Sequence, residues 1–364
     1  MKLKFRALIS GLLLFAVRCN PLPQTSEPAT PSPPTQAVSA ISATQTTIPS
    51  ETRPSPTILP TFTPEAIIGQ VIATIPVGPM PGGVLAIGEG AVWVPNSGNS
   101  TISRIDPQTN QVVTTIEIGE RGGSYGSPLA VAVTPGAVWV TDNAGLAVVR
   151  IDPMTNELAA RIPLERRIAG VWRDVEPYSL SADNEAVWVT GLESDSIIRI
   201  DPETNQVIAS LKLPSPSGVA IGENAIWVAN HRQGTVSRID PETNDVIATV
   251  DVPGGNPEAV AVSENAVWVT DSVTGTVTRI DPETDQVIAT TPSVGARANG
   301  IAVGGGAVWV TSFARGTLTR IDLETGQIVG SLELAPAVGV AFGEESVWVG
   351  DIMNSSVLRI TPLP

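Results

Sequence analysis

Cysteine and histidine are almost missing from this chain of 364 residues. It contains one cysteine, Cys19, and one histidine, His231. A single cysteine excludes an internal disulfide framework and a cysteine-rich zinc site. A single histidine excludes a metal centre built from several imidazoles.

Basic side chains are also scarce. Lysine and arginine number 21 against 36 aspartates and glutamates, and the formal net charge is −15. A protein with this charge repels phosphate backbones, so we expect no nucleic-acid partner. The sequence also lacks an EF-hand loop, a P-loop and a G-x-S-x-G elbow, which argues against the chemistry that each of these motifs supports.

The apolar run at the N-terminus is too short to span a bilayer. It covers residues 7–17 and follows the basic segment MKLKFR, so we predict a signal peptide over residues 1–18. Residues 19–64 are rich in Pro, Ser and Thr, which predicts a disordered tether. Cys19 directly after the signal resembles the first mature residue of bacterial lipoproteins. The resemblance implies that Cys19 is lipidated and anchors the protein to a membrane outside the cytoplasm; the alternative is plain secretion.

A seven-residue motif recurs along the rest of the chain. RIDPETN stands at 199–205 and 238–244, and near copies begin at residues 104, 150, 279 and 320. Its Asp can bond its own backbone and its Pro presets φ, so we interpret the motif as a hairpin turn between two strands. The last position holds residue types that tolerate a positive φ. These residues are Asn110, Asn156, Asn205, Asn244, Asp285 and Gly326.

Seven tryptophans recur in AVWV-like segments, 39 to 49 residues apart. In residues 258–291 the runs EAVAV, AVWVTD, TVTRID and QVIATT predict four antiparallel strands. Such a period with four short strands is typical of a propeller. We therefore predict an all-β, seven-bladed β-propeller over residues 65–364, with the repeated tryptophans packed between blades.

The seventh unit has no fourth strand before the chain ends at Pro364. Residues 69–78 match residues 110–119 and have no blade in front of them. We predict that this N-terminal strand closes the seventh blade, so that the ring has no open edge. In this alignment Gly69 falls on the left-handed turn position.

The repeat resembles the YVTN-type repeat of YncE-like bacterial β-propellers over about residues 69–361. Residues 227–230, WVAN, stand where that family has YVTN. The frame is also similar to that of the streptogramin B lyases, and this resemblance implies histidines, a glutamate and magnesium at an active site. His231 alone cannot supply that histidine set. The resemblance implies the fold and leaves the activity open.

One position of the repeat predicts the mouth of the central channel. It lies eight residues before each AVWV-type segment, where the chain enters the innermost strand. Four successive blades place polar groups there, which is what an oriented polar ligand requires. The polar residues are Tyr178, Ser217, Glu258 and Asn299, and the remaining blades have Gly83, Leu129 and Val338.

The loops on the same face add further candidates. The connection 164–178 carries Trp172, the only tryptophan outside the repeat, and Arg173. It predicts either a lid over the channel, with Trp172 as a stacking platform, or a loop that Trp172 merely fixes to the ring. His231 and Arg232 share one loop, in which an exposed histidine is the simpler interpretation. Arg315 is another candidate, although single surface arginines are often only solvated.

Two functions follow from these patterns. The first is a monomeric, surface-tethered module that binds a polar ligand or a partner protein on its loop face, with no cofactor and with membrane contact only through Cys19. The second is an extracytoplasmic lyase-like or lactonase-like enzyme with a carboxylate-bound divalent cation in the channel. Glu258, Asp271 and Asp351 are candidates for carboxylate catalysis if they approach each other. The single histidine favours the first.

Overall fold

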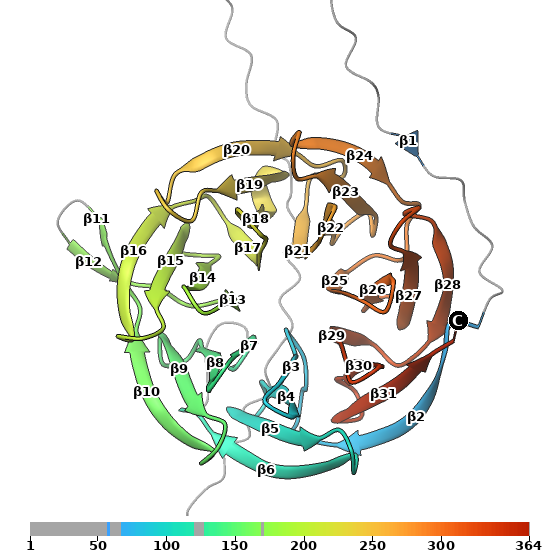
Figure 1. The fold of residues 1–364 in the computed structure, drawn as a ribbon, viewed down its shortest axis with the longest axis horizontal. Coiled ribbons are helices and arrows are strands. Elements are labelled where there is room, and N and C mark those ends of the chain that lie inside the picture. The colour runs from blue at the N-terminus through green and yellow to red at the C-terminus, as the bar shows by residue number, and fades with distance from the viewer. Residues whose placement is uncertain (1–56, 59–66, 120–126, 169–170, 364) are drawn as a thin grey trace, which may run out of the picture. The chain divides into compact units, whose positions relative to one another are not determined.

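Seven four-stranded antiparallel sheets are arranged around a common axis (Figure 1). The structure, a computed structural model, describes residues 57–58, 67–119, 127–168 and 171–363. The predicted signal peptide, Cys19 and most of the predicted tether lie outside the described residues. The prediction of an all-β, seven-bladed propeller is confirmed.

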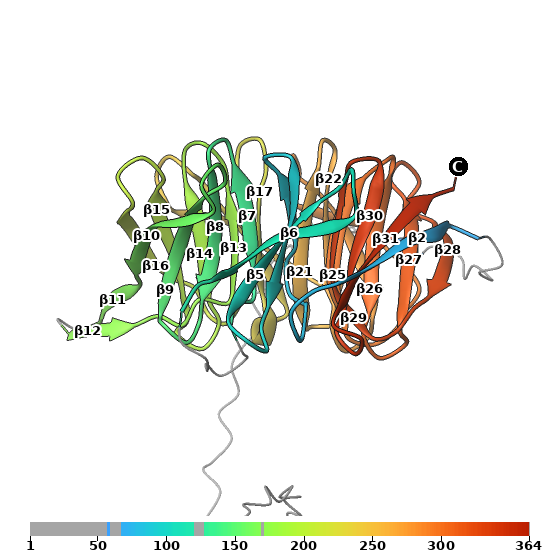
Figure 2. The same ribbon diagram turned by 90° about the horizontal axis from the view of Figure 1, so that it is seen from below.

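Each blade runs from an innermost strand at the axis to an outer strand at the rim (Figures 1 and 2). The innermost strands are β3 (Ala86–Gly88), β7 (Val131–Thr134), β13 (Ser179–Ala182), β17 (Pro216–Ile221), β21 (Pro257–Ser263), β25 (Ala298–Gly304) and β29 (Ala337–Gly343). The second strands are β4 (Ala91–Asn96), β8 (Ala137–Asp142), β14 (Val187–Gly191), β18 (Ile226–Asn230), β22 (Ala266–Asp271), β26 (Ala307–Ser312) and β30 (Ser346–Asp351).

The outer half of each blade is formed by the third and fourth strands. The third strands are β5 (Thr101–Asp106), β9 (Ala147–Asp152), β15 (Ser196–Asp201), β19 (Thr235–Ile239), β23 (Val277–Asp281), β27 (Thr317–Asp322) and β31 (Ser356–Pro362). The outer strands are β6 (Gln111–Glu117), β10 (Glu157–Pro163), β16 (Gln206–Lys212), β20 (Val246–Asp251), β24 (Gln286–Thr290), β28 (Ile328–Glu333) and β2 (Gly69–Pro76).

The second strands are buried on both faces because each blade packs between two others. Every residue of β22, for example, is buried, whereas the outer strand β6 alternates between exposed and more buried positions. The seven repeated tryptophans are 0–1% exposed and belong to the core clusters between blades. A fully buried side chain of this size contributes several kcal/mol, about 3–5 when it is truncated to alanine.

The RIDPETN motif forms the predicted hairpin turns. The residues at its last position have φ values between 57° and 71°. The Asp at the start of the turn accepts hydrogen bonds from backbone amides two and three residues later, as Asp201 does from Glu203 and Thr204. These amide hydrogen bonds lower the pKa of the Asp201 carboxyl below its ordinary value.

The arginine of the motif links each blade to the next. In blade seven, where the sequence reads RITPLP, the equivalent Arg359 places its guanidinium carbon 4.9 Å from the Trp348 ring centroid and donates to Asn110 Oδ1 of blade one at 2.9 Å. Four blades use Asn at the acceptor position, with Arg-to-Asn distances of 2.7–3.2 Å, and Arg238 pairs instead with Asp285 at 3.1 Å. The turn motif therefore also joins neighbouring blades.

The predicted closure of the ring is confirmed. β2 pairs antiparallel with β31, from Gly69 opposite Pro362 to Pro76 opposite Ser356. The expectation that Gly69 occupies a left-handed turn position is wrong, because Gly69 lies inside β2 and has no positive φ. In the other blades that position closes a hairpin, whereas here the two strands come from opposite ends of the propeller and no turn joins them.

Three short strands lie outside the seven blades. β1 (Thr57–Ile58) falls within the predicted tether and pairs in parallel with β24 at the outer edge of blade five. β11 (Glu165–Ile168) and β12 (Val171–Asp174) form a hairpin in the connection between blades two and three. Among the described residues, no helix has the length and apolar character needed to cross a bilayer.

Candidate functional site

A repeated irregularity of the innermost strands shapes the channel mouth. The pairing with the second strand shifts register between Pro216 and Val219, between Pro257 and Val260, between Ala298 and Gly300, and between Ala337 and Val340. Each shift is a β-bulge, which redirects a side chain and frees it from regular pairing. Glu258 and Asn299 stand at two of these bulges.

The threonine of the AVWVT segment stabilises this region. Thr190 Oγ1 accepts a hydrogen bond from the Ser179 amide at 3.1 Å and donates to Ser217 O of the next blade at 2.6 Å. Blade four has Ala229 in place of the threonine, and there the Ser217 hydroxyl bonds Glu258 O at 2.9 Å. Ser217 is fully buried and does not line the cavity, so its hydroxyl joins blades four and five.

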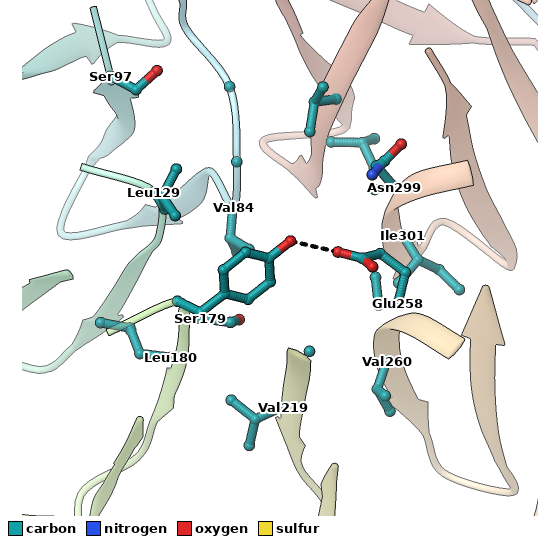
Figure 3. Close-up of a pocket in the computed structure, with 18 of the residues that line it drawn as sticks. Val84, Ser97, Leu129, Ser179, Leu180, Val219, Glu258, Val260, Asn299 and Ile301 are labelled. Carbon is teal, nitrogen blue, oxygen red and sulfur yellow. Dashed lines mark hydrogen bonds between the residues drawn. The ribbon is translucent and has the colours of Figure 1, made fainter. Parts of the chain in front are cut away.

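A cavity of about 420 Å³ opens at this mouth. Its wall includes six of the seven residues at the predicted channel position; Gly218 takes the place of Ser217 in blade four. Most of the lining is apolar, with Leu129, Leu180, Val219, Val260 and Ile301 among its members (Figure 3). A cavity of this size and composition fits a small ligand, for which about 300–1,000 Å³ is usual.

Three polar side chains from different blades meet at one edge of the cavity. Tyr178 Oη of blade three donates to Glu258 Oε1 of blade five at 2.6 Å, the dashed line in Figure 3. His231 Nδ1, in the loop that follows β18 of blade four, lies 3.0 Å from Glu258 Oε2 and 3.2 Å from Pro257 O. The Glu258 side chain is 11% exposed. Both carboxylate oxygens therefore have a partner, which fixes the orientation of the group.

The histidine differs from the simpler interpretation of the sequence. His231 begins a one-turn 3-10 helix, His231–Gln233, and its side chain is only 26% exposed rather than free in solvent. The hydrogen bond with Glu258 raises the pKa of the His231 imidazole above its ordinary value of 6.5, against the opposing effect of burial. His231 is not among the described residues that line the cavity, so its role there is to hold Glu258.

The other predicted loop residues are spread over the surface. Arg232 is exposed and pairs with Glu193 Oε1 at 2.6 Å, and Arg315 is exposed and outside the cavity wall. Trp172 and Arg173 lie in β12, whose hairpin extends outward beside β16 instead of over the axis (Figures 1 and 2).

The base of this hairpin explains its direction. Leu164 and Val175 are buried in the core between blades two and three, and the Val175 amide donates to Leu164 O at 2.9 Å. These two residues fix both ends of the connection at the ring, so the strands between them project away from it. The backbone path therefore does not match a lid over the channel mouth.

The residues present do not fit the magnesium site that the resemblance implies. The described part of the chain contains no group of three or more His, Cys, Asp and Glu side chains that could hold a metal ion. Asp271 accepts hydrogen bonds from the Val273 and Thr274 amides and the Thr274 hydroxyl in its own loop and from the Asn256 amide in the connection before β21, and Asp351 bonds Asn354. Both carboxylates therefore stabilise loops and do not join Glu258.

Sequence reasoning missed Arg297 as a cavity residue. It lies two residues before Asn299, lines the cavity, and places its guanidinium carbon 4.8 Å from the Phe313 ring centroid. The available signal was its place just before the channel position of blade six, where an arginine interrupts a run of small residues, SVGARANG. Asn299 also lines the cavity, and no described residue is a hydrogen-bond partner of its Oδ1.

Comparison with solved structures shows which proteins share this fold. Virginiamycin B lyase from Staphylococcus aureus is 18% identical with a TM-score of 0.69, covering 80% of this chain and 99% of that one. A streptogramin B lyase structure is 20% identical with a TM-score of 0.68, covering 79% and 94%. A catalytically inactive His-to-Ala variant of the S. aureus enzyme, with quinupristin, is 20% identical with a TM-score of 0.68, covering 80% and 99%.

At these identities the structural likeness shows the fold alone. No curated protein matches the chain significantly. The likeness to the YVTN-type repeat stays a prediction, whereas the profile of the virginiamycin B lyase family matches residues 171–363. Because this match spans more than half of the sequence, the chain belongs to the virginiamycin B lyase family.

Proposed function

We propose that the propeller is a binding module whose cavity takes a compact, mainly apolar ligand with a polar group that hydrogen-bonds to Glu258. The observation that carries the proposal is the Glu258 carboxylate, held at the edge of an otherwise largely apolar cavity of about 420 Å³ by Tyr178 and His231. A site whose polar group is already oriented loses less freedom on binding.

The Glu258 carboxylate retains capacity for a ligand. Its two oxygens offer about four acceptor positions, of which Tyr178 Oη and His231 Nδ1 use two. A hydrogen bond from a ligand to an ionised group in such a site is worth about 1.5–3 kcal/mol. The apolar walls add about 25 cal/mol for each Å² of apolar surface that the ligand buries.

The signal sequence and tether favour a location outside the cytoplasm. We propose that lipidated Cys19 holds the propeller at a membrane surface and that the propeller acts as a monomer. Labelling cells with radioactive palmitate tests this directly. The wild-type protein is expected to take up label and to sediment with membranes, and the Cys19→Ser variant is expected to do neither.

A thermal-shift screen of small molecules tests the binding proposal. A ligand at 100 times its Kd stabilises the folded state by about 2.7 kcal/mol, which is a rise of several degrees in Tm. Val84 lines the cavity and is 41% exposed, so Val84→Trp should block the cavity without disturbing the core. Val273→Trp is the matched control, because Val273 is 63% exposed and outside the cavity wall. Ligands that bind the Val84→Trp and wild-type proteins equally would contradict the proposal.

Family membership favours a second candidate, an enzyme that acts on streptogramin B antibiotics as a lyase. The Glu258 carboxylate lines the cavity and is oriented by His231, and an oriented carboxylate can act as a general base. Incubation with quinupristin, followed by liquid chromatography and mass spectrometry, tests this candidate. Conversion by the wild type that is lost in His231→Ala would favour the enzyme over the binding module.

A further inference from the structure

The cavity carries one charge of each sign on neighbouring blades. Among the described residues that line it, Glu258 in β21 is the only carboxylate and Arg297, just before β25, is the only strong base. No described ion pair joins them. The two charges therefore do not neutralise each other in an ion pair, and the rest of the wall is mainly apolar.

Arg297 has no carboxylate counter-ion among the described residues. Its amide donates to Ser272 O at 2.7 Å and its carbonyl accepts from the Phe313 amide at 3.0 Å, which fixes the backbone at a φ of 56°. The guanidinium lies over the Phe313 ring, and none of the carboxylates in the described part of the chain forms an ion pair with it. Guanidinium groups bind carboxylates through two parallel N–H···O hydrogen bonds, in bidentate geometry.

Asn299 adds a second donor from the same blade. Figure 3 shows its amide nitrogen on the side of the Glu258 carboxylate and its oxygen turned away. The Oδ1 atom is buried and has no hydrogen-bond partner among the described residues. Only the amide nitrogen, on the side of the Glu258 carboxylate, can donate to a ligand, and together with Arg297 it presents N–H donors to an anion.

We propose that the cavity binds a zwitterion, namely a dipeptide with apolar side chains. Its carboxylate binds Arg297 and Asn299, its ammonium group binds Glu258, and its side chains contact the apolar wall. The inference rests on the proposed binding function and names the ligand class of that site. A dipeptide matches both the separated charges and the cavity volume of about 420 Å³.

Isothermal titration of the full chain with leucyl-leucine tests the inference, alongside N-acetyl-leucyl-leucine, leucyl-leucinamide and the doubly capped peptide. Each single cap should weaken binding about tenfold or more, since each removes a charge-assisted hydrogen bond. Amidation of the peptide should not weaken its binding to Arg297→Gln any further, and acetylation of the peptide should not weaken its binding to Glu258→Gln any further. Arg315→Gln is the matched control, because Arg315 is exposed on the same face and outside the cavity wall.

Four outcomes would overturn the inference. Equal binding of the free and doubly capped peptides would leave the cavity as a binding site but not for a zwitterion. Equal losses in Arg297→Gln and Arg315→Gln would remove Arg297 from the site. Binding that survives Val84→Trp, or no binding of leucyl-leucine to the folded protein, would also reject the dipeptide, while the small-molecule screen decides the binding function separately.

Discussion

Tyr178→Phe removes the hydroxyl that bridges blades three and five. The lost bond is short, 2.6 Å, and its acceptor is a carboxylate whose side chain is 11% exposed. A hydrogen bond to a charged group contributes about 1.5–3 kcal/mol when both partners are buried. Because the Glu258 carboxylate keeps His231 and faces an open cavity, we expect the lower end, about 1.5 kcal/mol or a few degrees in Tm.

A double-mutant cycle separates this bond from other effects of the substitutions. Tyr178→Phe, Glu258→Gln and the double variant are unfolded in urea, and the free energies of unfolding are compared with the wild type. Residues in one network show coupling energies of about 0.5–3 kcal/mol. We expect about 1 kcal/mol or more for this pair. Additive losses, with a coupling near zero, would refute the reasoning that Tyr178 and Glu258 form a single unit.

Three further predictions concern the pH dependence of stability, the close approach of neighbouring blades and the closure of the ring by β2. The folded-state pKa of His231 is raised above 6.5, so His231 contributes stability that is fully present below pH 6.5 and is lost as the pH rises through the folded-state pKa. The Tm difference between the wild type and His231→Gln should therefore be larger at pH 5.5 than at pH 8.5. An equal difference at the two pH values would contradict this contribution of His231. Gly218→Ala should destabilise the protein by about 1–3 kcal/mol in chemical unfolding, because the new Cβ would lie 2.6 Å from Glu258 O. Gly82→Ala should cost less, because its nearest contact is the flexible Ile352 side chain at 3.3 Å. Deletion of residues 1–76 should expose the β31 edge and cause aggregation in size-exclusion chromatography, which deletion of residues 1–53 should not.

Most of the fold could be predicted because each repeat satisfies local rules. The turn position of RIDPETN accepts only residues that tolerate a positive φ, and Asn205 and Gly326 show φ values of 57° and 71°. The error at Gly69 arose from the same logic, applied where no hairpin exists. The Arg359–Asn110 bond could not be inferred locally, because its partners are 249 residues apart and meet only through the curvature of the ring.

The candidate site was less predictable. The channel position of the repeat gave Tyr178, Glu258 and Asn299, because in each blade the same position of the repeat enters the innermost strand, and all three line the cavity. His231 reaches Glu258 from a neighbouring blade, and this contact depends on the twist between blades. The hairpin carrying Trp172 projects outward because Leu164 and Val175 anchor its base, which no local pattern reveals.

The single histidine offers the most direct measurement of the Glu258 network. With isotope-labelled histidine, one imidazole signal reports His231, and its pH titration by NMR gives the folded-state pKa in the wild type and in Glu258→Gln. The structure predicts a wild-type pKa above 6.5 that falls when the Glu258 carboxylate is replaced. A titration that is the same in both proteins would contradict the claim that His231 holds Glu258 at the cavity.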